Sequence, residues 1–276
     1  PRPQEDTVKY EIVDGVAWVS FNRPDKRNCM SPKLNKQMLI VLEELEFRDD
    51  VQVLVLTGEG SAWSAGMDLL EYFREAEMQG LHKTREHQRQ AYGWWERLRW
   101  YEKPTVAMIN GWCFGGAYGP LFACDLAFCS DDAQFGLSEI NWGIIPGGQV
   151  TKAITATMAH RDAMFYAITG ETFDGKKASE MRLVNESVPA ERLRERTYEL
   201  AQQLAGKNPT VMRGTKMAVR MVQEMSWDVS DDYLMAKSSE ALFLDPERGR
   251  QQGLKQFLDD KSYKPGLSGY ARESGE

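Results

Sequence analysis

The chain has 276 residues, of which 42% are hydrophobic and 27% are charged, a composition typical of a globular protein with a full core. Its formal net charge of −7 comes from scattered acidic residues without a basic stripe, which argues against a nucleic-acid partner. The sequence contains no run of about 18 apolar residues and no apolar leader, so we expect no membrane span and a cytoplasmic location.

The first predicted elements are a hairpin and a helix. Residues 10–13 and 16–21 are predicted strands on either side of Asp14-Gly15, a dipeptide typical of a two-residue hairpin. Ser31 and Pro32 then predict the start of a helix, with the serine as its cap. This helix has apolar side chains at helical spacing, which predicts one buried face: Leu34, Met38, Val41, Leu42 and Leu45.

Strands and helices then alternate along the chain. Buried strands are predicted at residues 51–56, 105–109 and 126–129, and helices at residues 69–77 and across the charge-rich stretch 74–102. This order predicts an α/β core of repeated β-β-α units. From residue 192 onward the pattern is helical, so we divide the chain into a core of residues 1–195 and a helical region of residues 196–276.

The cysteine and histidine side chains give no sign of a reactive cluster. The four cysteines lie in apolar or strand-like segments without a metal-type pair, which predicts buried, reduced thiols and no metal site. His82 and His87 lie in the charge-rich stretch, where we expect solvated helix positions. Because no histidine has a recognisable partner, a Ser-His-Asp triad is not favoured.

A glycine turn follows the strand at residues 105–109 and opens the next helix. Gly115 and Gly116 would leave backbone N–H donors without acceptors at a helix start, where the helix dipole adds partial positive charge. Glycine also allows a ligand oxygen to approach the backbone closely. A tight turn without a ligand explains this pattern equally well.

A second segment and one acidic residue favour a site. Residues 64–68 read Ser-Ala-Gly-Met-Asp and also lead from a strand into a helix, so the Met67 and Gly116 N–H groups could converge on one oxygen as an oxyanion hole. Glu139 lies between apolar residues, where burial would raise its pKa toward the working pH of a proton shuttle.

These segments resemble the crotonase superfamily of acyl-CoA enzymes. The matching pieces are residues 21–28, 64–68, 110–117, 123–126, and 135–139 with 146–148. The resemblance implies a spiral of β-β-α units, a C-terminal helical region for oligomerisation, and trimers that pair into hexamers. It also implies an acyl-CoA thioester substrate whose oxygen is held by Met67 and Gly116, with Glu139 as the catalytic acid and base. No metal or redox cofactor is expected, because coenzyme A is part of the substrate.

Residues 67–75, 110–116, 136–143 and 255–262 are most similar to the hydroxycinnamoyl-CoA hydratase-lyase subfamily. That resemblance implies hydration of feruloyl-CoA or another 4-hydroxycinnamoyl-CoA, followed by retro-aldol cleavage to an aldehyde such as vanillin and acetyl-CoA. It assigns substrate contact to Tyr72, Gly119, Trp142, Tyr233 and Met235. It assigns contact with coenzyme A to Lys26, Arg27 and Ala65.

Two positions depart from the family patterns. Gly119 stands where ordinary hydratases carry their first glutamate and where the subfamily carries serine, and Met235 stands where the subfamily carries a second tyrosine. These departures leave open a hydratase or isomerase of another acyl-CoA that does not cleave a carbon–carbon bond. A non-catalytic crotonase-fold protein that binds RNA or a partner is a more distant alternative.

Overall fold

Two β-sheets form the frame of the first part of the chain. The computed structural model describes residues 6–264, 266 and 268–272, and contacts divide the chain into two units, with the boundary in the sequence between Leu204 and Ala205. The larger sheet is parallel apart from its first strand, and its spatial order is β1 (Val8–Val13), β2 (Val16–Phe21), β3 (Val53–Gly58), β5 (Thr105–Ile109), β7 (Leu126–Ser130) and β10 (Glu186–Val188).

The smaller sheet has the spatial order β4 (Ala62–Ser64), β6 (Trp112–Phe114), β8 (Gln134–Gly136) and β9 (Thr172–Asp174). Three of its strands, β4, β6 and β8, each directly follow a strand of the larger sheet, and the fourth, β9, comes after α6 (His160–Thr169). The chain therefore lays one strand in each sheet and then forms a helix, three times in succession. This is the repeated β-β-α unit that the sequence predicts.

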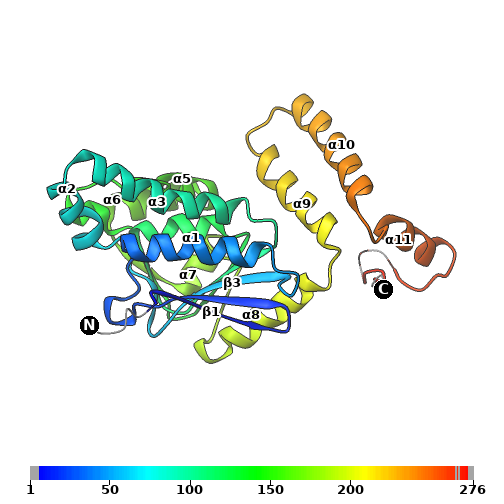
Figure 1. Ribbon diagram of the computed structural model, residues 1–276, viewed down its shortest axis with the longest axis horizontal. Coiled ribbons are helices and arrows are strands. Elements are labelled where there is room, and N and C mark those ends of the chain that lie inside the picture. The colour runs from blue at the N-terminus through cyan, green and yellow to red at the C-terminus, as the bar shows by residue number, and fades with distance from the viewer. Residues whose placement is uncertain (1–5, 265, 267, 273–276) are drawn as a thin grey trace. The chain divides into compact units, whose positions relative to one another are not determined.

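Helices cover the sheets of the first unit. α1 (Pro32–Glu46) and α3 (Leu81–Arg99) run side by side over the larger sheet (Figure 1). The other α-helices of this unit are α2 (Glu75–Met78), α4 (Tyr118–Ala123), α5 (Val150–Thr157), α6 (His160–Thr169), α7 (Gly175–Glu180) and α8 (Ala190–Ala205). Short 3₁₀ turns are η1 (Pro24–Lys26), η3 (Gly115–Ala117) and η4 (Ser138–Trp142).

The predicted hairpin and first helix are confirmed. Asp14 and Gly15 both have positive φ, 48° and 78°, as a type I′ turn requires, and they join β1 to β2. The Ser31 hydroxyl accepts a hydrogen bond from the Leu34 N–H at 3.2 Å and so caps α1. Four of the five predicted apolar positions on α1 are buried, and the fifth, Val41, is half-buried.

The predicted helices at residues 69–77 and 74–102 are partly wrong. Residues 69–74 form a π-helical segment, η2 (Leu69–Arg74), and the helix that follows ends at Met78. Gly80, whose φ of 95° disfavours other residue types, separates it from α3. His87 is buried, not solvated as expected, because it lies on the inner face of α3 with Trp94 and Leu98. His82 is exposed.

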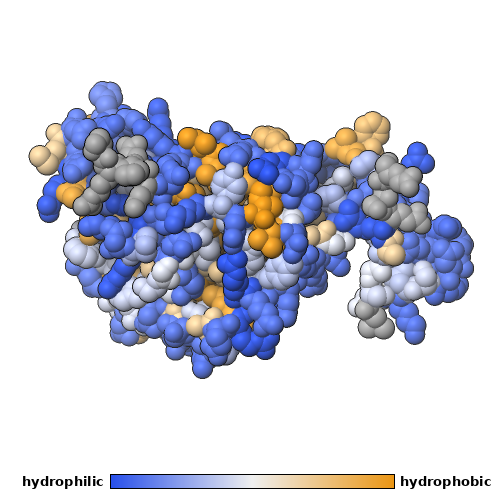
Figure 2. Space-filling model, turned by 60° about the horizontal axis from the view of Figure 1, so that its bottom comes forward, coloured by the Kyte–Doolittle hydropathy of each residue, from blue (hydrophilic) through white to orange (hydrophobic). Residues whose placement is uncertain are grey.

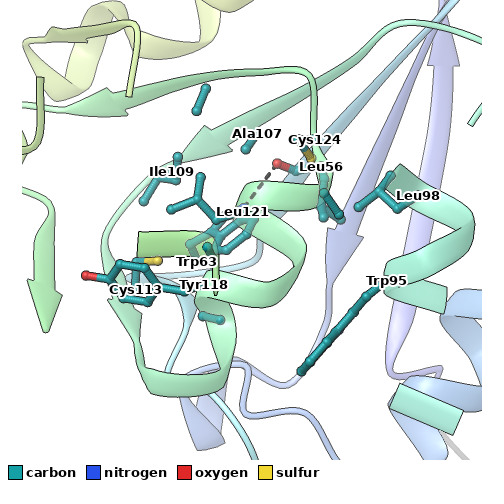
Figure 3. Close-up of a cluster of buried hydrophobic side chains, with 14 of the residues drawn as sticks. Leu56, Trp63, Trp95, Leu98, Ala107, Ile109, Cys113, Tyr118, Leu121 and Cys124 are labelled. Atoms are coloured by element: carbon teal, nitrogen blue, oxygen red, sulfur yellow. Dashed lines mark hydrogen bonds between the residues drawn. The ribbon is translucent and has the colours of Figure 1, made fainter. Parts of the chain in front are cut away.

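Large aromatic side chains fill the core between the sheets and α3. Trp63, Trp94, Tyr101 and Tyr118 are fully buried. The Trp63 Nε1–H donates to the Leu56 carbonyl at 3.1 Å, so this indole is buried without losing its hydrogen bond (Figure 3). Cys113, Cys124 and Cys129 are also buried, as predicted, whereas Cys29 is only half-buried, contrary to the prediction.

The described part of the second unit is helical. It contains α9 (Pro209–Val222), α10 (Trp227–Leu244) and α11 (Gly249–Leu258). Asp245 accepts hydrogen bonds from the Asn208 side chain at 3.0 Å and from the Gly249 N–H at 2.7 Å, which ties the ends of these helices together. None of the helices among the described residues has the length and apolar content that crossing a bilayer requires. On the face that Figure 2 shows, hydrophilic side chains predominate and apolar ones form separate patches.

Candidate active site

The segment that carries Met67 is held by backbone hydrogen bonds to residues 27–30. The Ala65 N–H donates to the Arg27 carbonyl at 2.8 Å, the Met30 N–H donates to the Gly66 carbonyl at 2.7 Å, and the Asp68 N–H donates to the Met30 carbonyl at 3.1 Å. The Met67 N–H has no acceptor within the described part of the chain. It is therefore an available donor on a fixed backbone.

Gly116 places a second donor next to the first. It is the middle residue of η3, where an N–H has no acceptor within the helix. A Cβ on Gly66 would lie 3.0 Å from the Gly116 nitrogen, and a Cβ on Gly116 would lie 3.3 Å from the Met67 nitrogen. The backbone of residues 66–67 thus lies against the backbone at Gly116, and this close approach is possible because Gly66 and Gly116 have no side chain. This geometry suits two N–H groups that share one oxygen acceptor.

Glu139 lies beside the glycine turn, in η4. A Cβ on Gly115 would come within 3.1 Å of the Glu139 Oε1 atom, and Gly115 also has a positive φ of 50°. Glu139 is 8% exposed, and its Oε2 atom is buried without a hydrogen-bond partner among the described residues. Burial raises the pKa of this carboxyl, against a smaller opposing effect of a backbone hydrogen bond.

These groups open into one cavity of about 690 Å³ in the first unit. Seven of the residues predicted from the sequence line it: Arg27, Ala65, Met67, Tyr72, Gly116, Glu139 and Trp142. An aromatic wall that the sequence prediction missed also lines it: Phe73, Tyr92, Trp95, Trp112 and Phe114. Part of this wall could have been predicted from the spacing of Gln88, Tyr92 and Trp95, which places all three on one face of α3.

Four predicted residues are not part of this lining. Lys26 is exposed in η1. Gly119 lies under the cavity wall, where a Cβ would come within 2.7 Å of the Trp95 ring. Tyr233 and Met235 belong to α10 in the second unit. The binding roles of all four stay predictions.

An ion pair fixes the start of η2 and, through it, the Met67 segment. One Asp68 oxygen accepts hydrogen bonds from the Leu70 and Glu71 N–H groups at 3.0 and 2.9 Å, and the other lies 2.9 Å from the Arg23 guanidinium. Burial by itself would raise the pKa of Asp68, but the hydrogen bonds from Glu71 and Arg23 outweigh it and hold this pKa below its usual value.

The cavity has an exposed rim and a buried interior. At the rim, the Arg27 guanidinium lies 4.0 Å from the centre of the Trp112 ring, and Trp112 is 37% exposed. In the interior, Tyr72 is 6% exposed. No group of three or more potential metal ligands occurs among the residues that the structure describes.

The fold agrees with that of a known class of proteins. An enoyl-CoA hydratase from Mycobacterium smegmatis superposes with a TM-score of 0.85 at 20% identity, over 98% of this chain and 99% of that one. Enoyl-CoA hydratase subunit I from Geobacillus kaustophilus HTA426 superposes with a TM-score of 0.82 at 28% identity, over 92% and 95%. The molecule therefore has the α/β fold of the enoyl-CoA hydratases.

The chain belongs to the enoyl-CoA hydratase/isomerase family, whose model matches residues 11–264. A hydroxycinnamoyl-CoA hydratase-lyase from Pseudomonas fluorescens is 57% identical to it over 267 residues, which are 96% of this chain and 97% of that protein. The fold class and the family predicted from the sequence are thus confirmed. The roles of individual site residues stay predictions.

Proposed function

We propose that the chain is a hydroxycinnamoyl-CoA hydratase-lyase that converts feruloyl-CoA, or another 4-hydroxycinnamoyl-CoA, to a hydroxybenzaldehyde and acetyl-CoA. The relative from Pseudomonas fluorescens supports this assignment. One observation carries it: of the described residues that line the cavity, Glu139 alone has a carboxyl group. A single carboxyl suits a substrate whose para-hydroxyphenyl ring donates electron density toward the carbon that water attacks.

Hydration is the first stage of the proposed reaction. The Glu139 carboxylate takes a proton from water, and the water oxygen bonds to the β-carbon of the substrate. Negative charge moves to the thioester oxygen, where the Met67 and Gly116 N–H groups stabilise the enolate. Glu139 then returns the proton to the α-carbon, which completes the addition of water.

Cleavage is the second stage and uses the same groups. Glu139 takes the proton of the new β-hydroxyl, the Cα–Cβ bond breaks, and its electron pair forms the enolate of acetyl-CoA. The enolate oxygen occupies the same pair of N–H donors. Protonation of the enolate carbon by Glu139 gives acetyl-CoA and restores the carboxylate, and the aldehyde leaves.

The exposed rim and the buried interior suggest how the substrate lies. Coenzyme A is large and charged, so we place it at the rim, with Arg27 and Lys26 near its phosphates and Ala65 along its chain. The aromatic acyl group then enters the buried interior, where Tyr72 contacts its phenolic hydroxyl. Trp142 is 64% exposed, so we place its contact with the substrate near the rim. We also propose that the chain assembles as a trimer or a hexamer through its C-terminal helical region.

The test is to incubate the purified protein with feruloyl-CoA and with crotonyl-CoA. Vanillin and acetyl-CoA from feruloyl-CoA are the expected products. Hydration of crotonyl-CoA without aldehyde from feruloyl-CoA would instead identify a hydratase of another acyl-CoA. If no acyl-CoA stabilised the protein against heat, a binding role for another partner would replace the enzymatic one.

The Glu139→Gln variant is the matched control for the chemistry. It should fold and bind CoA esters, because the amide has nearly the shape of the carboxyl, and it should lose most turnover because it cannot accept a proton. Near-normal aldehyde release by this variant would contradict the role of Glu139.

A further inference from the structure

One face of α3 brings a second tyrosine into the cavity. Gln88, Tyr92 and Trp95 are spaced four and three residues apart, so their side chains project from the same side of the helix, and all three line the cavity. The facing element is η2, which contributes Tyr72. Two tyrosines therefore line the cavity from two elements in contact.

The position of the Tyr92 hydroxyl is defined by its neighbours. The Tyr92 ring packs against the Trp95 ring with their centres 5.4 Å apart. The hydroxyl lies over Gly148, where a Cβ would come within 2.9 Å of the phenolic oxygen. Gly148 also has a positive φ of 60°, a conformation that L side chains rarely adopt, so the backbone here leaves room for the hydroxyl.

The two hydroxyl groups have unused hydrogen-bonding capacity. Among the described residues, neither the Tyr72 nor the Tyr92 hydroxyl has a protein partner, whereas the core Tyr101 hydroxyl donates to the Leu42 carbonyl at 3.0 Å. Burial raises the pKa of Tyr72, and the nearby Tyr92 raises it further; burial also raises the pKa of Tyr92. Both groups stay protonated at neutral pH, so each can donate one hydrogen bond and accept another.

From this placement we propose that Tyr92 is a specificity-determining residue that binds, together with Tyr72, the phenolic hydroxyl on the ring of the aromatic acyl group. A phenolic hydroxyl can accept a hydrogen bond from one tyrosine and donate one to the other, which satisfies both groups. This inference rests on the proposed function, because it assumes that the ring enters the interior of the cavity. Tyr92 would give the phenolic hydroxyl a second tyrosine partner from the first unit. This chain has Met235 at the position where the subfamily has its second tyrosine.

The alternative is that Tyr92 only fills space beside Trp95. The two readings differ in the role of one oxygen atom, so Tyr92→Phe separates them while it keeps the ring. A packing role predicts equal effects on all aromatic acyl groups. A binding role predicts an effect only on those with a ring oxygen.

The experiment measures equilibrium binding in the Glu139→Gln background, in which the substrates are not consumed. The dissociation constants of feruloyl-CoA and of cinnamoyl-CoA, which lacks the ring oxygens, are measured with and without Tyr92→Phe. We expect feruloyl-CoA to bind about five- to tenfold more weakly to the double variant, with less than about a twofold change for cinnamoyl-CoA. Tyr72→Phe in the same background should show the same selectivity.

Tyr166→Phe is the matched control, because Tyr166 is a half-buried tyrosine that packs on Phe173 with ring centres 4.4 Å apart and does not line the cavity. It should leave both constants unchanged. Equal weakening of both esters by Tyr92→Phe, or no weakening of either, would overturn the inference. Aldehyde release by the wild-type protein reports on the proposed function separately, so either idea can fail while the other stands.

Discussion

At the scale of single residues, the Trp95 ring leaves no room for a side chain at position 119. A Cβ on Gly119 would lie 2.7 to 2.9 Å from three atoms of the Trp95 ring, which is 2% exposed and is held between the rings of Tyr92 and Trp94. The indole thus occupies the space that a serine or glutamate at position 119 would need. The single-carboxyl site is therefore a property of this pair of residues rather than of Gly119 alone.

Gly119→Ala tests this coupling. A glycine in a helix normally gains up to about 1 kcal/mol on replacement by alanine, whereas overpacking a core typically costs about 1–3 kcal/mol. We expect the overpacking to dominate and the melting temperature to fall. In a Trp95→Leu background the same substitution should be neutral or stabilising, and an equal loss in both backgrounds would contradict the steric explanation. Thermal unfolding of the four proteins gives the comparison.

The buried carboxyl of Glu139 predicts two pH effects. Its raised pKa means that the base form is lost at a higher pH than for a solvated glutamate, so kcat should fall as pH falls through that raised value. The same burial makes the ionised form costly to the fold above the raised pKa, and this cost disappears once pH falls below the ordinary value of about 4.3.

Glu139→Gln should therefore raise the melting temperature at pH 8, by about 2–4 °C per kcal/mol regained, and the gain should vanish near pH 4. Glu171→Gln, which neutralises an exposed glutamate next to α6, is the control and should show no such gain. A gain that grows as pH falls would contradict the assignment of a burial cost to the Glu139 carboxylate.

The catalytic candidates were predictable from the sequence, and the aromatic wall was not. Met67, Gly116 and Glu139 stand in glycine-containing segments next to strands, and the combination of two such turns with one acidic residue favours a site even though a tight turn explains each glycine pattern alone. Tyr92 and Trp95 stand in a helix, where an aromatic stripe most often means ordinary core packing. Only the structure distinguishes Trp94, which is fully buried in the core, from its neighbour that lines the cavity.

At the scale of elements, η2 is the part that positions the site. Asp68 caps this π-helical segment and pairs with Arg23, and it directly follows the Met67 donor. The sequence predicted an ordinary helix here, because the apolar spacing of residues 69–77 does not distinguish a π turn from an α turn. The hairpin and α1 were predictable because a dipeptide turn and a capping serine act locally.

Asp68→Ala removes the cap and the ion pair together. Loss of the cap should cost about 0.5–2 kcal/mol of stability. We expect kcat to fall more than KM rises, because the displaced Met67 N–H acts on the enolate; complete loss of one such donor costs about 10²–10³ in kcat. Asp68→Asn, which keeps a capping oxygen without the charge, should retain more activity. Equal kcat in the wild type and Asp68→Ala would show that the cap does not position the donor.

At the scale of the whole molecule, α10 carries many exposed apolar side chains in the single chain. Seven of its side chains are exposed in the single chain: Trp227, Val229, Leu234, Met235, Leu242, Phe243 and Leu244. Exposed apolar side chains in such number on one helix are typical of an interface. The sequence predicts a helical region here but cannot show that its apolar side chains stay uncovered, because burial depends on how the helices pack.

Phe243→Glu tests whether this helix joins copies of the chain. Phe243 is 88% exposed in the single chain, so a charge here should leave the fold of one chain intact, whereas burying that charge against another copy would cost several kcal/mol. We expect the wild type to have the mass of a trimer or hexamer by light scattering after size exclusion, and Phe243→Glu to shift toward the monomer. Phe243→Leu, which stays apolar, should keep the wild-type mass. A monomeric wild type, or an unchanged mass for Phe243→Glu, would place any interface elsewhere than at Phe243.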